Sequence, residues 1–76
     1  MAKLPPGLSG RQVRAALERT GFVFQRQKGS HMVLRRETPH ARVVIPDHKQ
    51  IRVGTLRRIV ADAGLEVDSF LALIRR

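Results

Sequence analysis

One short segment combines the groups needed for acid–base chemistry on a phosphodiester: Arg26-Gln27-Lys28-Gly29-Ser30-His31. In it a histidine follows directly on a Gly-Ser turn and is preceded by cations. Histidine as a residue type titrates near pH 6.5, so it can accept and donate protons near neutrality. A ribose phosphodiester supplies its own nucleophile, the 2′-hydroxyl. His31 could deprotonate that hydroxyl or protonate the departing 5′-oxygen.

The neighbours of His31 fit the same chemistry. Cations at Arg26, Lys28 or Arg35 could stabilise the charge that builds up on the phosphoryl group. Gly29 permits a positive φ and a close approach of phosphate to the backbone, and the N–H groups of a turn can bind that phosphate. A single histidine in a strand is more often structural than catalytic, so these residues alone define a candidate and no more.

Other chemistries find no support in the sequence. His31, His40 and His48 lie nine and eight residues apart and the chain has no cysteine, which is not a metal-ligand spacing. No phosphate-binding loop with its Lys-Ser/Thr is present. The acidic residues are scattered and offer no carboxylate pair for hydrolysis. We therefore expect neither a metal nor a cofactor.

The charge of the chain indicates a polyanionic partner. The 76 residues include 15 basic and 6 acidic side chains, a formal charge of +9. Such a field favours nucleic acid, although a solvated basic surface would look the same. The absence of Tyr and Trp predicts recognition of shape and backbone rather than base stacking. The lack of cysteine, of a bilayer-spanning apolar run and of an apolar signal core predicts a cytoplasmic location without membrane contact.

The elements that must position His31 begin with a helix near the N-terminus. Ser9 is suited to cap this helix, because Gln12 three residues later completes a capping box. Gly21 is a natural end. The apolar residues that recur at helical spacing between them are Val13, Ala16 and Leu17.

Three strands and two helices should follow. The strands are predicted at residues 22–27, 31–36 and 41–45, joined by short turns into an antiparallel meander that Pro46 ends. After a polar loop at residues 47–52, one helix should run from Val53 or Gly54 to Ala63. The last helix is capped by Glu66 or Asp68 and turns three apolar residues inward: Phe70, Leu71 and Ile74.

Together these elements predict an α+β fold of order α-β-β-β-α-α. Helices should cover one face of a three-stranded antiparallel sheet and leave the other face open. A chain of 76 residues is expected to form a single domain, residues 1–76, with a thin core and a shallow surface site.

With these residues in view, the chain resembles the HicA (YcfA-like) toxin family over about residues 8–74. The segments that carry the resemblance, in order and spacing, are Gly21-Phe22, Arg26-Gln27-Lys28-Gly29-Ser30-His31, Val43-Val44-Ile45-Pro46, Gly54-Thr55-Leu56-Arg57-Arg58-Ile59 and Ala63-Gly64-Leu65. The Gly-Ser-His triplet is weak alone, but the whole series is specific. Two positions depart from the family pattern. Glu66 stands where Ser or Thr usually caps the last helix, and Asp47-His48 stands in a loop that is usually richer in His and Lys.

The resemblance implies a double-stranded-RNA-binding-domain-like fold and a toxin–antitoxin system. It implies an mRNA interferase, a metal-independent endoribonuclease with a single catalytic histidine that corresponds to His31, and a HicB-type antitoxin as partner. A second acid–base group is left open between His48 and Lys28. The residues expected to bind RNA are Arg26, Lys28, Gly29, Ser30, Arg35, Arg36, Arg42 and Lys49. The alternatives are a double-stranded-RNA-binding module without chemistry and an inactive relative kept for binding the antitoxin.

Overall fold

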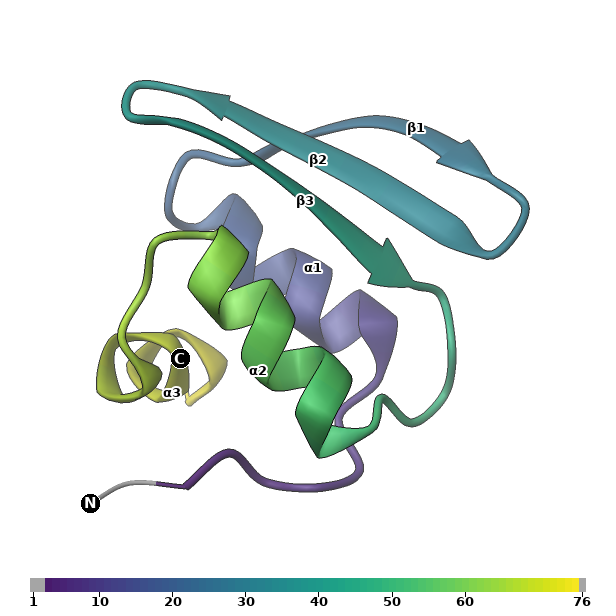
Figure 1. The fold of residues 1–76 in the computed structure, drawn as a ribbon, viewed down its shortest axis with the longest axis vertical. Helices are drawn as coiled ribbons and strands as arrows, with labels where there is room; N and C mark the ends of the chain where they lie inside the picture. The colour runs from purple at the N-terminus through teal and green to yellow at the C-terminus, as the bar shows by residue number, and fades with distance from the viewer. Residues whose placement is uncertain (1–2, 76) are drawn as a thin grey trace.

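The computed structural model describes residues 3–75 and confirms the predicted α+β order (Figure 1). Three strands form one antiparallel sheet in the order β1-β2-β3, and helices lie against one of its faces. Each helix within the described residues is too short or too polar to cross a membrane. The elements are α1 (Gly10–Glu18), β1 (Val23–Lys28), β2 (His31–Glu37), β3 (His40–Pro46), α2 (Val53–Asp62) and α3 (Val67–Ile74).

Helix α1 begins at the predicted capping box. The Gln12 N–H donates to Ser9 Oγ at 3.1 Å, and the Ser9 N–H donates to Gln12 Oε1 at 2.8 Å. Two of the helix's first N–H groups therefore have partners. The N–H of Gly10 donates to the carbonyl of His48 at 2.9 Å. This bond docks the start of α1 on the chain that leaves β3.

The sheet differs from the prediction at its ends. Phe22 was expected in the first strand, but β1 begins at Val23. The Phe22 N–H still donates to the Leu17 carbonyl at 3.4 Å, so its backbone belongs to the end of α1. The third strand was expected to stop at residue 45, just before Pro46. In the structure Pro46 is still part of β3, as its last residue, and pairs with His31.

Strand β1 contains a bulge at Gln25. Phe24 pairs with Leu34 and Arg26 pairs with Val33, so Gln25 is an additional residue with no partner of its own. In a regular strand Phe24 and Arg26 would share a face. The bulge reverses the alternation. Phe24 therefore lies against the core, and Arg26 and Lys28 turn to the face without helices.

The core lies between the sheet and the helices (Figure 1). The sheet side chains that enter it include Met32, Leu34, Val43 and Ile45, all at most 1% exposed. Helix α3 packs on α1, where Arg19 Nη1 donates to the Leu73 carbonyl at 2.7 Å. The second helix ends at Asp62, with Ala63 as its cap, and Glu66 caps α3 without a side-chain hydrogen bond.

Candidate functional site

The face of the sheet that carries no helix gathers most of the cations predicted to bind a ligand. Register and pleat place three cross-strand rows on it: Lys28, His31 and Pro46; Arg26, Val33 and Val44; Val23, Arg35 and Arg42. We call this surface the open face. Because each row crosses all three strands, one extended polyanion lying on the open face would contact several cations together.

The cations of the open face are not neutralised by the protein. Within residues 3–75 the ion pairs are Arg11–Asp47, Arg14–Glu18 and Arg58–Asp62, and none of them includes a cation of the open face. Arg35 and Arg42 lie directly opposite each other, and like charges in that position destabilise a sheet. The buried Nε of Arg35 also has no hydrogen-bond partner in the described part of the chain. A bound anion would relieve both costs.

His31 is exposed at the end of this surface, as the first residue of β2. It lines three neighbouring hollows. The first lies on the open face with Arg26, Lys28 and Gly29. The second lies between β3 and α2 with Thr55 and Arg58, and the third lies over the loop after β3. The imidazole therefore meets solvent from several directions, as a group that transfers protons to a surface substrate must.

The turn before His31 is held in place on both sides. Gly29 has φ +59°, in the left-handed region that favours glycine. Its carbonyl accepts a hydrogen bond from Gln27 Nε2 at 3.1 Å. The Ser30 carbonyl accepts from the Asp47 N–H at 2.6 Å. These bonds fix the backbone on which the His31 side chain stands.

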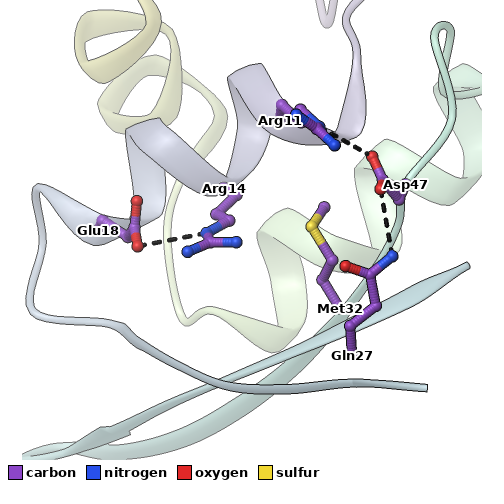
Figure 2. Close-up of a pocket in the computed structure, with 6 residues that line it drawn as sticks. All are labelled: Arg11, Arg14, Glu18, Gln27, Met32 and Asp47. Atoms are coloured by element: carbon purple, nitrogen blue, oxygen red, sulfur yellow. Dashed lines mark hydrogen bonds and ion pairs between the residues drawn. The ribbon is translucent and has the colours of Figure 1, made fainter.

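Asp47 is the centre of this support (Figure 2). Its carboxylate accepts from Gln27 Nε2 at 3.2 Å and pairs with Arg11 Nε at 3.4 Å. The hydrogen bond from Arg11, followed by that from Gln27, holds the pKa of Asp47 below its usual range. One side chain thus connects α1, β1 and the end of β3 directly behind the Gly29-Ser30 turn. This role of Asp47 could not be predicted from the sequence, because its partner Arg11 lies 36 residues away.

The lowered pKa of Asp47 predicts a stability that depends on pH. The folded state stabilises the carboxylate, so its contribution is present above the unfolded pKa of about 3.9 and is lost as pH falls through the lower folded value. Asp47→Ala should therefore unfold at lower urea concentration than wild type at pH 7, with the difference shrinking below about pH 4. Glu37→Ala is the control, because the Glu37 carboxylate is exposed and forms no ion pair with the residues from 3 to 75. If Asp47→Ala and wild type differ in urea midpoint by the same amount at pH 7 and below about pH 4, the Asp47 carboxylate does not stabilise the fold in the way proposed.

Two residues predicted to bind RNA, Arg36 and Lys49, lie outside the open face and the hollows around His31. Arg36 is on the helix-covered side, stacked over the Phe22 ring at 4.7 Å. Its guanidinium donates to the carbonyls of Pro39 at 3.0 Å and Ala63 at 3.2 Å. Lys49 is exposed in the loop after β3 but lines none of the three hollows at His31. The structure therefore does not bring Arg36 or Lys49 together with His31.

The other predicted residues do gather near His31. Arg26, Lys28, Gly29 and Arg42 line hollows with His31, while Ser30 contributes its carbonyl to the turn. Arg35 is farther along the open face, opposite Arg42. The residues of α2 that line the hollows at His31 had no assigned place in the site: Thr55, Arg58, Ile59 and Asp62. Their helical spacing of three to four residues was the available signal, because it puts them on one side of the helix.

A helix-backed antiparallel sheet with an open cationic face and an exposed histidine defines a small α+β domain suited to a polyanion. Residues 10–65 match the family model described as the HicA toxin of bacterial toxin–antitoxin systems. The chain belongs to this family, and its members pair with an antitoxin. The matched segment includes the whole sheet, α1, α2 and His31. A search of curated proteins found no match.

Proposed function

We propose that this chain is an endoribonuclease toxin that cleaves mRNA without a metal ion, with His31 as its acid–base group. One observation carries the proposal. An exposed histidine stands at the edge of a sheet face whose cations have no ion-pair partners within residues 3–75. The family adds that the chain is the toxin of a toxin–antitoxin pair.

The proposed mechanism uses the open face as the binding surface. The RNA backbone lies along the rows that contain Arg26, Arg35 and Arg42, which neutralise phosphates without reading bases. One phosphodiester then reaches the end of the sheet, where His31 and Lys28 are paired across strands. His31 transfers a proton to or from a ribose or leaving-group oxygen. Lys28 stabilises the charge on the phosphoryl oxygens.

This chemistry needs no metal, because the nucleophile is the 2′-hydroxyl of the RNA itself. Within residues 3–75 no cluster of three or more His, Cys, Asp or Glu side chains could hold a metal ion. Cations and turn N–H groups supply the positive charge that a metal would otherwise provide.

A HicB-type antitoxin is the proposed protein partner. The open face and the hollows at His31 are exposed in the chain alone, so a protein that covers them would exclude RNA. Because the cations there include Arg26, Lys28 and Arg42, the covering surface should be acidic. Inhibition would then follow from occlusion of His31.

Purified protein incubated with an mRNA and EDTA tests the proposal. We expect cleavage, together with RNA binding that weakens with salt. If about four phosphates are engaged, the log–log salt slope should be near −3. Binding with that slope but without cleavage in EDTA would favour the alternative, a double-stranded-RNA-binding module without chemistry. An affinity that does not change with salt would remove the argument from the open face.

A further inference from the structure

We propose that His48 is a second catalytic residue, which together with His31 forms an acid–base pair across one hollow. The inference rests on the proposed ribonuclease function and adds a second proton-transfer group to it. One histidine can pass a proton in only one direction at a time. Cleavage requires a proton to leave the 2′-hydroxyl and another to reach the 5′-oxygen.

The register of the sheet brings the two histidines to the same side. His31 pairs with Pro46 at the end of the β2–β3 ladder, and the Asp47 N–H continues the pattern by donating to the Ser30 carbonyl at 2.6 Å. The Asp47 side chain points to the helix side, where it meets Gln27 (Figure 2). Side chains alternate along an extended chain, so the next residue, His48, turns to the side of His31.

The hollow over this loop contains both histidines. Its volume is about 450 Å³, and its lining includes His31, His48, Arg52 and Thr55. That volume is within the range of sites that hold a small ligand or a portion of a larger one. No carboxylate is among the described residues that line it. A phosphodiester placed there would meet both histidines and the cation of Arg52.

The loop that carries His48 is anchored at several points. The His48 carbonyl accepts from the Gly10 N–H at 2.9 Å, and the Ile51 N–H donates to the Leu8 carbonyl at 2.7 Å. Asp47, just before His48, bonds to the turn that precedes His31. The backbones of the two histidines are therefore held relative to each other, while both side chains remain exposed.

Lys28 is the other candidate for the second group. It lies beside His31 across β1 and β2 and lines the hollow on the open face rather than the one with His48. The proposed mechanism already gives Lys28 the stabilisation of charge on the phosphoryl oxygens. His48 is the better match to the second transfer.

One imidazole removes the proton of the 2′-hydroxyl while the 2′-oxygen forms a bond to phosphorus. The bond from phosphorus to the 5′-oxygen breaks, and the other histidine, as an imidazolium, protonates that oxygen. The products are a 2′,3′-cyclic phosphate and a 5′-hydroxyl. Proton exchange with water restores both histidines.

The His48→Ala variant, assayed on two substrates, tests the pair. On ordinary RNA we expect cleavage to fall by about a hundredfold. The second substrate carries sulfur in place of the bridging 5′-oxygen at one phosphodiester, and a thiolate leaves without being protonated. The variant that lacks the acid should then regain a rate near that of wild type, and the variant that lacks the base should not. Recovery of His48→Ala makes His48 the acid, whereas recovery of His31→Ala makes His48 the base.

The pH–rate profile is an independent measurement. Wild type should give a bell-shaped profile, and His48→Ala should lose one limb of it. The charged groups around the two histidines must be kept in both proteins, because they set the local field. They are Arg26 and Lys28 of β1, Arg42 of β3, Arg52 of the loop after β3, Arg58 and Asp62 of α2, and Asp47, which precedes His48 and lies on the helix side. A profile unchanged in shape would argue against the pair.

His40→Ala is the matched control. His40 is exposed at the other end of the β2–β3 hairpin, where it pairs with Glu37, about 20 Å along the strand from His31. Its loss should leave cleavage unchanged. His48→Gln, with circular dichroism of each variant, separates lost chemistry from lost folding. The pair is overturned if His48→Ala is fully active on ordinary RNA while His31→Ala is inactive. It is also overturned if neither variant regains activity on the sulfur substrate. Wild-type rates in both variants overturn the assignment of His31 as well as the pair, and a wild-type protein that cleaves no RNA overturns the ribonuclease proposal itself.

Discussion

Cleavage of RNA by the His31→Ala variant is expected to fall by roughly a hundredfold or more, because a positioned acid–base group contributes about 10²–10⁴-fold. The imidazole is exposed at the end of the open face, and His31 is not one of the residues of the hydrophobic core. Its removal should therefore take away proton transfer and leave the fold intact. The measurement is the initial rate of cleavage of an end-labelled mRNA in EDTA, at saturating protein.

Binding separates the chemical role of His31 from a structural one. Affinity for RNA should change little in His31→Ala, because Arg26, Arg35 and Arg42 remain on the open face. In cells, wild type should stop growth while mRNA disappears, and the variant should not. If His31→Ala cleaves as fast as wild type, the active site lies elsewhere. His48 would then be the first residue to examine.

The local parts of the fold could be predicted because each depends on residues close together in sequence. The capping box of α1 needs only Ser9 and Gln12, and the turn before His31 needs only Gly29 and its neighbours. The strands follow from runs of apolar and β-branched residues between turns. Such signals place His31 correctly at the start of β2.

The bulge at Gln25 could not be predicted in this way. Nothing in the local sequence says which residue of β1 goes unpaired, because the bulge is set by how the strand closes against both β2 and the helices. Yet the bulge decides that Arg26 and Lys28 lie on the open face. Arg26 and Lys28 therefore belong to the candidate site only because of the bulge, which is a feature of the tertiary structure.

The position of Arg36, in contrast, could have been predicted from the sequence. Met32 and Leu34 are apolar residues of the same strand, and residues two apart share a face. The pattern therefore put Arg36 on the buried side and its neighbour Arg35 on the open side, as observed. Grouping the two arginines by charge alone overlooked the alternation.

The contacts of Asp47 that support the turn before His31 join residues far apart in the sequence, so they could not be predicted from it. Asp47 connects Arg11 and Gln27, which lie 36 and 20 residues away in sequence, and the two histidines of the proposed pair are brought together by the same ladder. Charge and spacing along the chain carry no information about such pairings. The sequence could point to His31 and leave His48 open, whereas the register places both histidines beside one hollow, which the proposed pair requires.

Gly10→Ala is expected to be the substitution most damaging to this support. A Cβ at residue 10 would stand 2.0 Å from the Pro46 carbonyl oxygen and 3.2 Å from Asp47 Cα, and both are backbone atoms that cannot rotate away. Such overpacking costs about 1–3 kcal/mol, occasionally more. In a domain of this size each kcal/mol lowers the melting temperature by about 4–8 °C. Calorimetry or urea unfolding measures the loss.

Gly54→Ala is the matched control for Gly10→Ala. Gly54 also lies in the first turn of a helix, α2, but a Cβ there meets no atom within 4 Å. Alanine should stabilise that helix by about 0.5–1 kcal/mol, because glycine loses more backbone entropy on folding. Opposite signs for the two substitutions would show that contact with the Pro46–His48 segment, not helix propensity, requires glycine at residue 10. Because that segment carries His48, Gly10→Ala should also slow cleavage at temperatures where it remains folded. A Gly10→Ala protein as stable as wild type would mean that α1 does not hold the loop.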